Sequence, residues 1–439
     1  MAKRKISFVL FLILSFTLTC KAQEVKLEDL INTALKNSQN VRTAILDDSI
    51  ADERITEIKS NMLPQVSVNG DYKYYSQIPV QLISASIMGG PPNYYVPFEF
   101  GVPWNLGTTF SLGQLLFSQE YITGVKMAKT GKELSELSLK KTKEELVYNL
   151  SASYYNAQII NAQMDFIRGN ITNISKLIET GKLLYENQMI KYSDVEKLQL
   201  NKTMLETQEQ TLAVTYSEII NLLKFLAGIP QPDSLKIDNN ITTKADIFRY
   251  TKIKPDRTEV RLLEKKKELY EIERKNIFAG YLPTLSAYGI YNYTFFGKGG
   301  GADLFKGYPA SWFGLQLKWN IFDGLNRKSR MEQKDIELKK IDLQMNQLNE
   351  NISMEMNNAM NQIILQRSTI QNRKEQLSLA EKLYDQTQLQ FKEGLVTITD
   401  VIQSENSLKE AQNNYIVSIV KLLYAQLSWN KAAGKLINK

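Results

Sequence analysis

One apolar pattern constrains this chain more than any other. Between Leu146 and Ile178, apolar and small residues recur at gaps of three and four without a slip. The series is Leu146, Leu150, Ser153, Ala157, Ile160, Met164, Ile167, Ile171, Ile174 and Ile178. This heptad spacing predicts a helix that packs along its length and supercoils left-handed. With its flanks, from about 118 to 185, the helix would be on the order of 100 Å long. No globular domain has a core of that depth.

A return helix from about Asp194 to Ala227 follows, with Lys202 and Glu209 interrupting its apolar side. The same arrangement recurs 206 residues downstream, where Phe391 aligns with Tyr185 (391 − 185). The other matches at this offset are Met189-Ile190 with Leu395-Val396, Ser193-Asp194-Val195 with Thr399-Asp400-Val401, and Gly228 with Gly434. The chain is therefore predicted to be a tandem duplication in which each half contains a helix–turn–helix tip.

The repeat defines the predicted domain boundaries. After residues 1–22 come a first repeat (23–232), a connector (233–254) and a second repeat (255–439). The long helical hairpins are expected at 118–228 and 323–433. Shorter helices are expected over about 25–62, where Pro64 ends the second of two, and over about 257–278.

Four segments change from helical spacing to strict alternation. In 65–75 the residues Val66, Val68, Tyr72 and Tyr74 alternate with polar ones. The segments 104–117, 284–296 and 311–322 also alternate, although Tyr288 and Ile290 interrupt the polar side of the third segment. A period of two predicts β-strands with one apolar face. The first two strands are expected to form one hairpin across a long loop (about 76–103) rich in Gly, Pro and Tyr.

The N-terminus is predicted to be a signal peptide. Lys3, Arg4 and Lys5 precede an apolar run from about Ile6 to Leu18, too short to span a bilayer, and a small residue, Ala22, suits cleavage. The alternative is lipidation of Cys20. Cleavage would leave 50 basic and 47 acidic residues, so the net charge of +7 falls to +3 and gives no reason to expect a nucleic-acid partner. Without histidine, and after loss of the only cysteine, no metal site or cofactor is expected.

The strands make most sense in a bilayer. An exported chain without a spanning helix is secreted, periplasmic or an outer-membrane barrel, and strands of ~9–11 tilted residues span the hydrocarbon. Four strands cannot close, since the smallest such barrels have about 8, whereas three copies would supply twelve. The expected fold is an α+β membrane protein with a trimeric 12-stranded barrel. Four aromatics near strand ends would form an interfacial belt: Tyr74, Trp104, Phe295 and Trp312. A soluble half-buried sheet is the alternative.

The sequence FKEGLVTITDV (391–401), the Leu-Pro junctions at 63–64 and 282–283, and the two-fold repeat resemble TolC-type outer-membrane efflux proteins. The resemblance covers nearly the whole mature chain. It implies a homotrimer in the outer membrane of a Gram-negative bacterium, with the barrel in outer-membrane lipid and an α-barrel extending into the periplasm. Its tips would dock onto a periplasmic adaptor protein and an inner-membrane transporter.

The resemblance also assigns roles at the tips. Asp400 matches an acidic position that narrows the pore, Asp194 is its counterpart in the first repeat, and Gln403 replaces a second acidic residue. Phe391 and Val396 replace a tyrosine and an arginine that lock the tip through hydrogen bonds, so that lock is not expected here. The turn residues expected to contact an adaptor are Gly394, Leu395, Val396, Phe391, Gln188, Met189 and Tyr185.

The tip residues also have simpler interpretations. Asp400 and Asp194 lie in a first helical turn, where a carboxylate is stabilised by the helix dipole. Thr397 or Thr399 is suited to capping the second return helix, and Ser193 with Glu196 matches a capping box. Gly394 is expected to relieve backbone strain, although Gln188 occupies the aligned position.

The function indicated is the exit duct of a tripartite efflux pump. The first alternative is the exit channel of a type I protein secretion system. The second, from a different class, is a structural coiled-coil protein of the envelope, which predicts long helices without regular amphipathic strands. An enzyme is not expected, because the sequence shows no catalytic constellation.

Overall fold

The computed structural model describes residues 24–231, 233–239, 255–298 and 306–437. The predicted signal peptide, with Cys20, and most of the predicted connector lie outside these residues. The described residues form two compact units. The helical unit comprises residues up to Asp47, Glu136–Leu263 and those from Gln344 onward. The sheet unit comprises Asp48–Ser135 and Glu264–Leu343. Each unit takes residues from both sequence repeats, so division by packing differs from division by repeat.

Seven helices are described, close to their predicted bounds. They are α2 (Leu27–Asn37), α3 (Gln39–Ser60), α4 (Gln119–Glu186), α5 (Tyr192–Ala227), α6 (Thr258–Ala279), α7 (Asn326–Lys392) and α8 (Ile398–Ala432). The prediction of two very long helices is confirmed, because α4 has 68 residues and α7 has 67. Among the described helices, none carries an apolar run long enough to cross a membrane.

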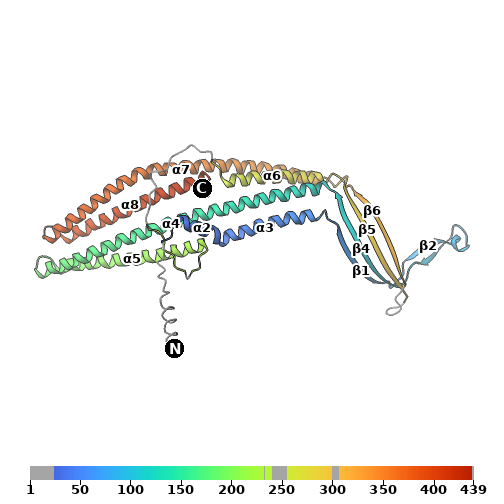
Figure 1. The fold of residues 1–439 in the computed structure, drawn as a ribbon, viewed down its shortest axis with the longest axis horizontal. Helices are drawn as coiled ribbons and strands as arrows, with labels where there is room; N and C mark the ends of the chain where they lie inside the picture. The colour runs from blue at the N-terminus through green and yellow to red at the C-terminus, as the bar shows by residue number, and fades with distance from the viewer. Residues whose placement is uncertain (1–23, 232, 240–254, 299–305, 438–439) are drawn as a thin grey trace, which may run out of the picture. The chain divides into compact units, whose positions relative to one another are not determined.

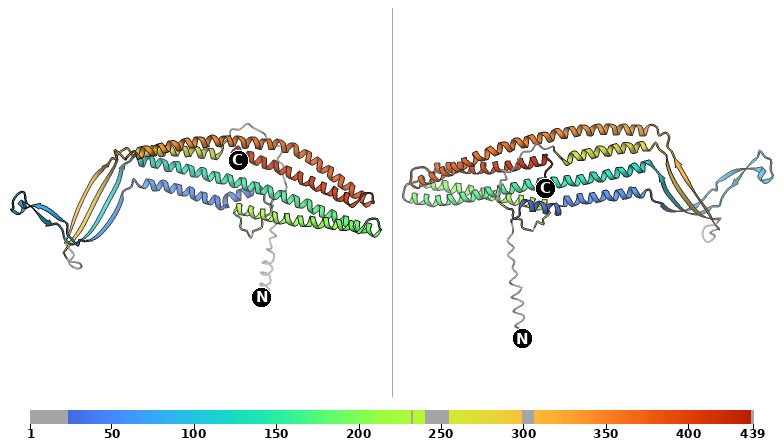
Figure 2. Two further views of the ribbon diagram at one scale, coloured as in Figure 1. Left: turned by 180° about the vertical axis from the view of Figure 1, so that it is seen from behind. Right: turned by 45° about the horizontal axis from the view of Figure 1, so that its top comes forward.

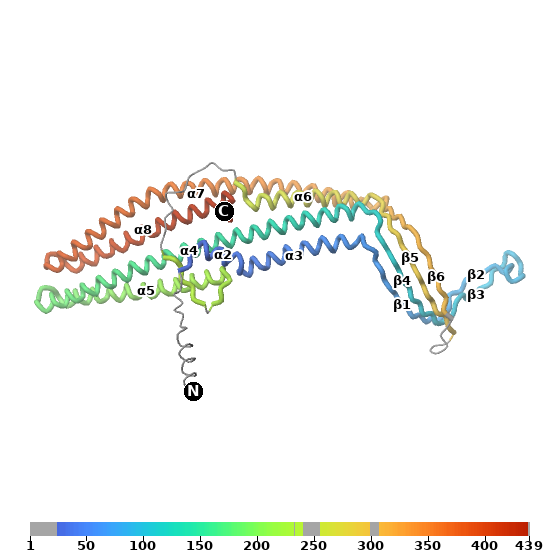
Figure 3. Tube along the Cα trace, viewed as in Figure 1, coloured from blue at the N-terminus to red at the C-terminus, as the bar shows by residue number. Residues whose placement is uncertain are grey.

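The sheet unit contains a four-stranded antiparallel sheet in the order β1-β4-β5-β6, drawn side by side in Figure 3. Its strands are β1 (Gln65–Tyr74), β4 (Trp104–Phe117), β5 (Thr284–Gly297) and β6 (Lys306–Lys318). The predicted pairing of the first two strands as a hairpin is confirmed. Within the described residues β1 and β6 are the two edges, and each lacks a neighbour on its outer side.

The predicted bounds of the last strand, 311–322, are wrong. β6 ends at Lys318, opposite Thr284, because β5 begins there, directly after a proline that has no N–H for the ladder. Trp319, predicted to continue the strand, instead donates its indole N–H to the carbonyl of Tyr281 at 2.9 Å.

The segment predicted as one long loop contains two further strands. β2 (Val80–Ser84) pairs with β3 (Tyr95–Glu99), and a short 3₁₀ helix, η1 (Ala85–Met88), lies between them. The glycines and prolines of the segment concealed this hairpin, since proline is tolerated in a two-stranded ribbon, where one side of each strand is free.

In the helical unit, α4 returns through α5 and α7 returns through α8, as two hairpins (Figures 1 and 2). One apolar core joins both hairpins near their turns and includes Leu177, Leu198, Tyr384 and Leu408. A second core joins α2, α4 and α5. It also takes in Ile237 of the predicted connector, which is fully buried and bridges to Val25.

Candidate functional site

The two tip turns share one backbone geometry. At the first, Gln188 is left-handed (φ 61°), its N–H donates to the carbonyl of Tyr185 at 2.8 Å, and that of Met189 donates to Leu184 at 2.8 Å. At the second, Gly394 is left-handed (φ 72°), and the equivalent bonds run from Gly394 to Phe391 (3.0 Å) and from Leu395 to Gln390 (2.9 Å). Both turns are Schellman motifs. Gln188 shows that a residue other than glycine can occupy this left-handed position.

The return helices begin differently. At α8 the Thr397 hydroxyl accepts from the Asp400 N–H at 3.4 Å, and the Asp400 carboxylate accepts from the Thr397 N–H at 2.9 Å. This is a capping box, so Thr397 rather than Thr399 is the cap. The capping box predicted for Ser193 and Glu196 is wrong. Because α5 begins at Tyr192, its cap position is Lys191, and Ser193 lies inside the first turn.

The two tip carboxylates have different electrostatic environments. Asp400 is exposed, and its pKa is lowered by the hydrogen bonds from the Thr397 hydroxyl and N–H. It is therefore ionised at neutral pH, and no lysine or arginine of the described chain pairs with it. Asp194 is less exposed and forms an ion pair with Lys197 at 2.9 Å. Asp400 thus contributes the less compensated negative charge. Gln403, one turn further along α8, is exposed.

The predicted contact residues divide by burial. Leu395 is 75% exposed, Met189 58% and Tyr185 45%. Gln188 and Gly394 are exposed as well, and Val396 is partly buried. Phe391 is 1% exposed and belongs to the apolar core, so the structure places it beneath the turn rather than on its surface.

A buried polar bridge between the two hairpins was not predicted from the sequence. The Asn201 side-chain amide on α5 donates to Glu405 Oε2 on α8 at 2.5 Å, and Glu405 is 1% exposed. Burial raises the pKa of Glu405 and also that of the neighbouring Tyr384. Further along, Asn170 of α4 donates to Gln412 of α8 at 3.2 Å, again buried. The sequence did contain a signal for this bridge, because Asn201 and Glu405 lie three or four residues from apolar residues that are buried on the same helix.

The sheet has two chemically distinct faces. The register joins Val68, Phe110 and Tyr291 across β1, β4 and β5 on one face, called the apolar face below. The other, called the polar face, joins Ser67 to Ser111, whose hydroxyls lie 2.7 Å apart, and carries the Lys73–Asp71 ion pair at 2.7 Å.

The belt prediction for Trp312 is wrong. It lies opposite Ile290, which lies opposite Ser111, so Trp312 is on the polar face and in the middle of β6. Tyr74, Trp104 and Phe295 lie on the apolar face as expected, with the Tyr74 and Trp104 ring centroids 4.4 Å apart. Successive side chains of a strand point to opposite faces, so Trp312 cannot share the face of Phe313. Because β6 begins at Lys306, Trp312 also lies away from both strand ends.

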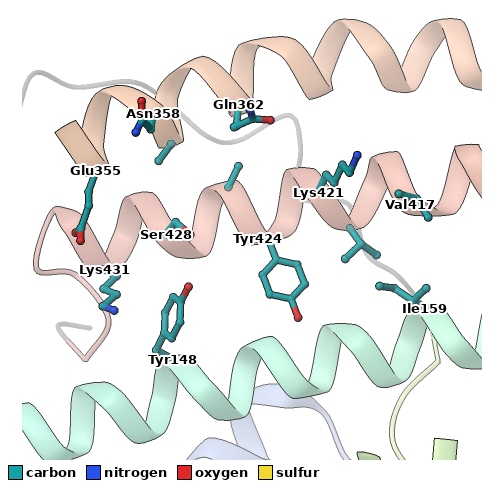
Figure 4. Close-up of a pocket in the computed structure, with 13 residues that line it drawn as sticks. Tyr148, Ile159, Glu355, Asn358, Gln362, Val417, Lys421, Tyr424, Ser428 and Lys431 are labelled. Atoms are coloured by element: carbon teal, nitrogen blue, oxygen red, sulfur yellow. The ribbon is translucent and has the colours of Figure 1, made fainter. Parts of the chain in front are cut away.

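The helical unit also has an open cavity of about 770 Å³ between α4, α7 and α8. Figure 4 shows Tyr148 and Tyr424 beside Lys421 and Lys431 at this cavity. Lys431 Nζ lies 4.5 Å from the Tyr148 ring centroid. In the part of the chain that the structure describes, no group of side chains is suited to holding a metal ion.

Both the sequence and the fold of this chain are similar to those of known outer-membrane proteins. Residues 278–434 match a family described as outer membrane efflux protein. Outer membrane protein TolC of Salmonella enteritidis is 19% identical over 427 residues, covering 94% of this chain and 83% of the relative. The chain is therefore similar in sequence to TolC over most of its length.

Solved structures share the fold. VceC of Vibrio cholerae superimposes with a TM-score of 0.72 at 15% identity, over 93% of this chain and 96% of that chain. CusC also gives a TM-score of 0.72, at 14% identity, over 94% of this chain and 92% of that chain. The overall fold of this chain is thus similar to those of VceC and CusC.

Proposed function

The chain belongs to the outer membrane efflux protein family, and from that premise we propose that it forms the outer-membrane exit duct of a tripartite efflux pump. Its location is the outer membrane, with a helical portion in the periplasm. The duct would be passive, receiving small molecules from a periplasmic adaptor and an inner-membrane transporter.

The observation that carries this proposal is the open, two-faced sheet. The apolar face has no charged residue on any of its four strands, whereas the polar face holds Asp71 and Lys73. A charge facing lipid is destabilising, so the apolar face suits hydrocarbon and the polar face suits water. In a bilayer the two edges must also be paired.

Closure by three copies satisfies that requirement. β1 and β6 run in opposite directions, because each neighbouring pair across the sheet is antiparallel. The β6 edge of one copy can therefore pair with the β1 edge of the next, and three copies give a 12-stranded barrel. Such a barrel is wide enough for an aqueous lumen.

The exposed tip residues support a docking role for the hairpin ends. Leu395 and Met189 present apolar side chains to solvent at the two turns. A single exposed apolar side chain is ordinary, but exposed apolar side chains at equivalent positions of both turns are a repeated feature. We propose that these turns, with Tyr185, Gln188, Gly394 and Val396, contact the adaptor, and that Phe391 supports them from beneath.

The proposal is tested with the protein purified in detergent. We expect the purified protein to migrate as a trimer until it is boiled and to form ion-conducting pores in planar bilayers. Deletion of its gene should make cells more sensitive to small toxic compounds. A protein without pores would contradict it. Loss of protein export, with compound resistance unchanged, would instead favour the type I secretion alternative. The described sheet already argues against a purely coiled-coil envelope protein.

We propose that Asp400 lines the periplasmic constriction together with the Asp400 residues of the other two copies. Asp194 and Gln403 are proposed to line it as well. Three converging carboxylates attract cations, so Asp400→Asn should shift the selectivity of single pores toward anions. The effect of Asp194→Asn should be smaller, because Lys197 already compensates that charge. The reversal potential in a salt gradient measures both.

The control for Asp400→Asn is Thr397→Ala, which removes the capping hydroxyl and retains the carboxylate. If the charge determines selectivity, Thr397→Ala leaves the reversal potential unchanged. Equal shifts in both variants would assign the effect to the cap and remove the charge ring.

A further inference from the structure

The polar face of the sheet is chemically divided. Its β1–β4 half carries Ser67, Asn69, Thr109 and Ser111, all small or polar. Its β5–β6 half carries polar residues as well, among them Asn292 and Thr294, but it adds five large side chains: Tyr288, Ile290, Phe296, Tyr308 and Trp312. These five residues are called the aromatic track below.

In the single chain, the rings of the track are accessible rather than packed into a core. Trp312 is 45% exposed, Tyr308 50%, Phe296 39% and Tyr288 36%. Exposed aromatics on a surface that otherwise faces water are unexpected, since the lumen face of a barrel is ordinarily polar. Aromatic rings grouped on such a surface offer an apolar contact to molecules that pass along it.

The geometry aligns the track with the strands. Ile290 lies directly opposite Trp312, and Tyr288 follows two residues along β5, on the same face. Alternate residues of a strand lie about 6.8 Å apart, so one planar molecule can contact two successive positions. Further along, the Phe296 and Tyr308 ring centroids are 6.0 Å apart.

Gly314 makes the surface flat beside Trp312. The Tyr288 ring lies across this glycine, because a Cβ added there would meet the ring's hydroxyl oxygen at 3.1 Å and its Cζ at 3.2 Å. The ring therefore presents a face along the sheet, which suits stacking.

Neutral hydrogen-bonding groups adjoin the Tyr288 end of the track. An open cavity of about 550 Å³ is lined in part by Tyr288 and Ile290 and in part by Ser67, Ser111 and Gln316. Apolar walls with a few convergent polar groups are typical of small-molecule sites. No charged residue lines this cavity, so a neutral ligand fits better than an ion.

We propose that the aromatic track is a binding path for neutral, planar aromatic molecules that pass along the lumen. The proposal rests on the exit-duct function, because it requires the polar face to line the passage. It defines the substrate class further: planar aromatics would dwell on β5–β6, whereas sugars of similar size would pass the rings without stacking.

Caffeine is a suitable probe, because it is planar, neutral and soluble, and glucose is the non-aromatic comparison. Single wild-type trimers in planar bilayers should show caffeine-dependent current interruptions that glucose does not produce. Trp312→Ala should shorten their mean duration about three- to tenfold, as expected for loss of one stacking partner. Trp312→Phe, which retains a ring, should restore part of it, and Tyr288→Ala should act like Trp312→Ala.

The matched control is Phe313→Ala, one residue away on the apolar face, where the side chain is 92% exposed. It should leave the caffeine interruptions unchanged. Equal durations in wild type and Trp312→Ala, or an equal loss in Phe313→Ala, would overturn the track while leaving the duct intact. Trimers that conduct no ions at all would overturn the exit-duct function itself.

Discussion

Replacing Gly228 by alanine is expected to lower the stability of the helical unit by about 3 kcal/mol or more. Gly228 ends α5 in a left-handed conformation (φ 66°). An added Cβ would lie 2.6 Å from the carbonyl carbon of Asn37 and would also meet its oxygen. Backbone atoms cannot move aside as a flexible side chain can, so the end of α5 would have to separate from the end of α2.

Gly434 should be equally intolerant. It is also left-handed (φ 73°), and its added Cβ would lie 2.6 Å from the carbonyl carbon of Asp256. The two glycines are 206 residues apart in the chain, so the close approach occurs at equivalent points of the two predicted repeats. The apparent thermal midpoint, followed by circular dichroism at 222 nm in detergent, should fall for either alanine variant.

Gly394 is the control that distinguishes the effect of a steric clash from the cost of the left-handed backbone conformation. It has a similar angle (φ 72°), but an added Cβ would meet only the terminal methyl carbon of Met189, at 3.2 Å. Gly394→Ala should therefore cost only about 1 kcal/mol, the penalty of the left-handed conformation. If it destabilised the protein as much as Gly228→Ala, the close approach to Asn37 would not be the cause.

The long elements were predictable because a single period extends over many residues. Ten consecutive heptad positions leave little freedom in α4, and strict alternation placed β1 and β4 within a residue of their observed ends. The tip turns were predictable for another reason. Their backbone geometry follows from local hydrogen bonds, which the aligned positions of both hairpins satisfy in the same way.

Pairing across the chain was harder to predict. The apolar side of α5 was expected to be interrupted at Lys202, but the buried polar residue is Asn201, and the buried polar residue facing it from α8 is Glu405. A polar residue at the spacing of an apolar seam can face either solvent or the core, so its burial is known only once its partner helix is known. Trp312 was misplaced for a different reason, because β6 begins at Lys306, before the predicted start at 311, and Trp312 therefore lies at its middle.

Loss of the hydrogen bond between Asn201 and Glu405 is expected to have the second large effect, on the stability of the contact between the two hairpins. Within the described residues Glu405 Oε2 accepts only from Asn201, and Glu405 Oε1 has no partner. Asn201→Leu would leave a buried carboxylate without a donor, at a cost of about 3 kcal/mol at pH 8. Local opening between the hairpins should increase about a hundredfold. Hydrogen-exchange protection factors of amides in 401–412 would measure it.

The pH dependence follows from the pKa of Glu405, which burial raises in the folded protein. The native state then binds a proton more tightly than the unfolded chain, so this stability is full below the unfolded pKa and is lost as pH rises through the folded one. The nearby charge of Lys409 opposes the shift, and Tyr384 faces the same site from α7. Protection in the wild type should therefore increase from pH 8 to pH 5.

Asn201→Leu should show that trend more steeply, because its unpaired carboxylate gains most from protonation. Glu405→Gln should abolish it, since an amide can still accept from Asn201 and does not titrate. Asn170→Leu is the matched control, because it breaks a buried bridge to Gln412, which is neutral. Its cost, about 1–2 kcal/mol, should be the same at both pH values. If Asn170→Leu acquired the same pH dependence as Asn201→Leu, a group other than Glu405 would control the separation of the two hairpins.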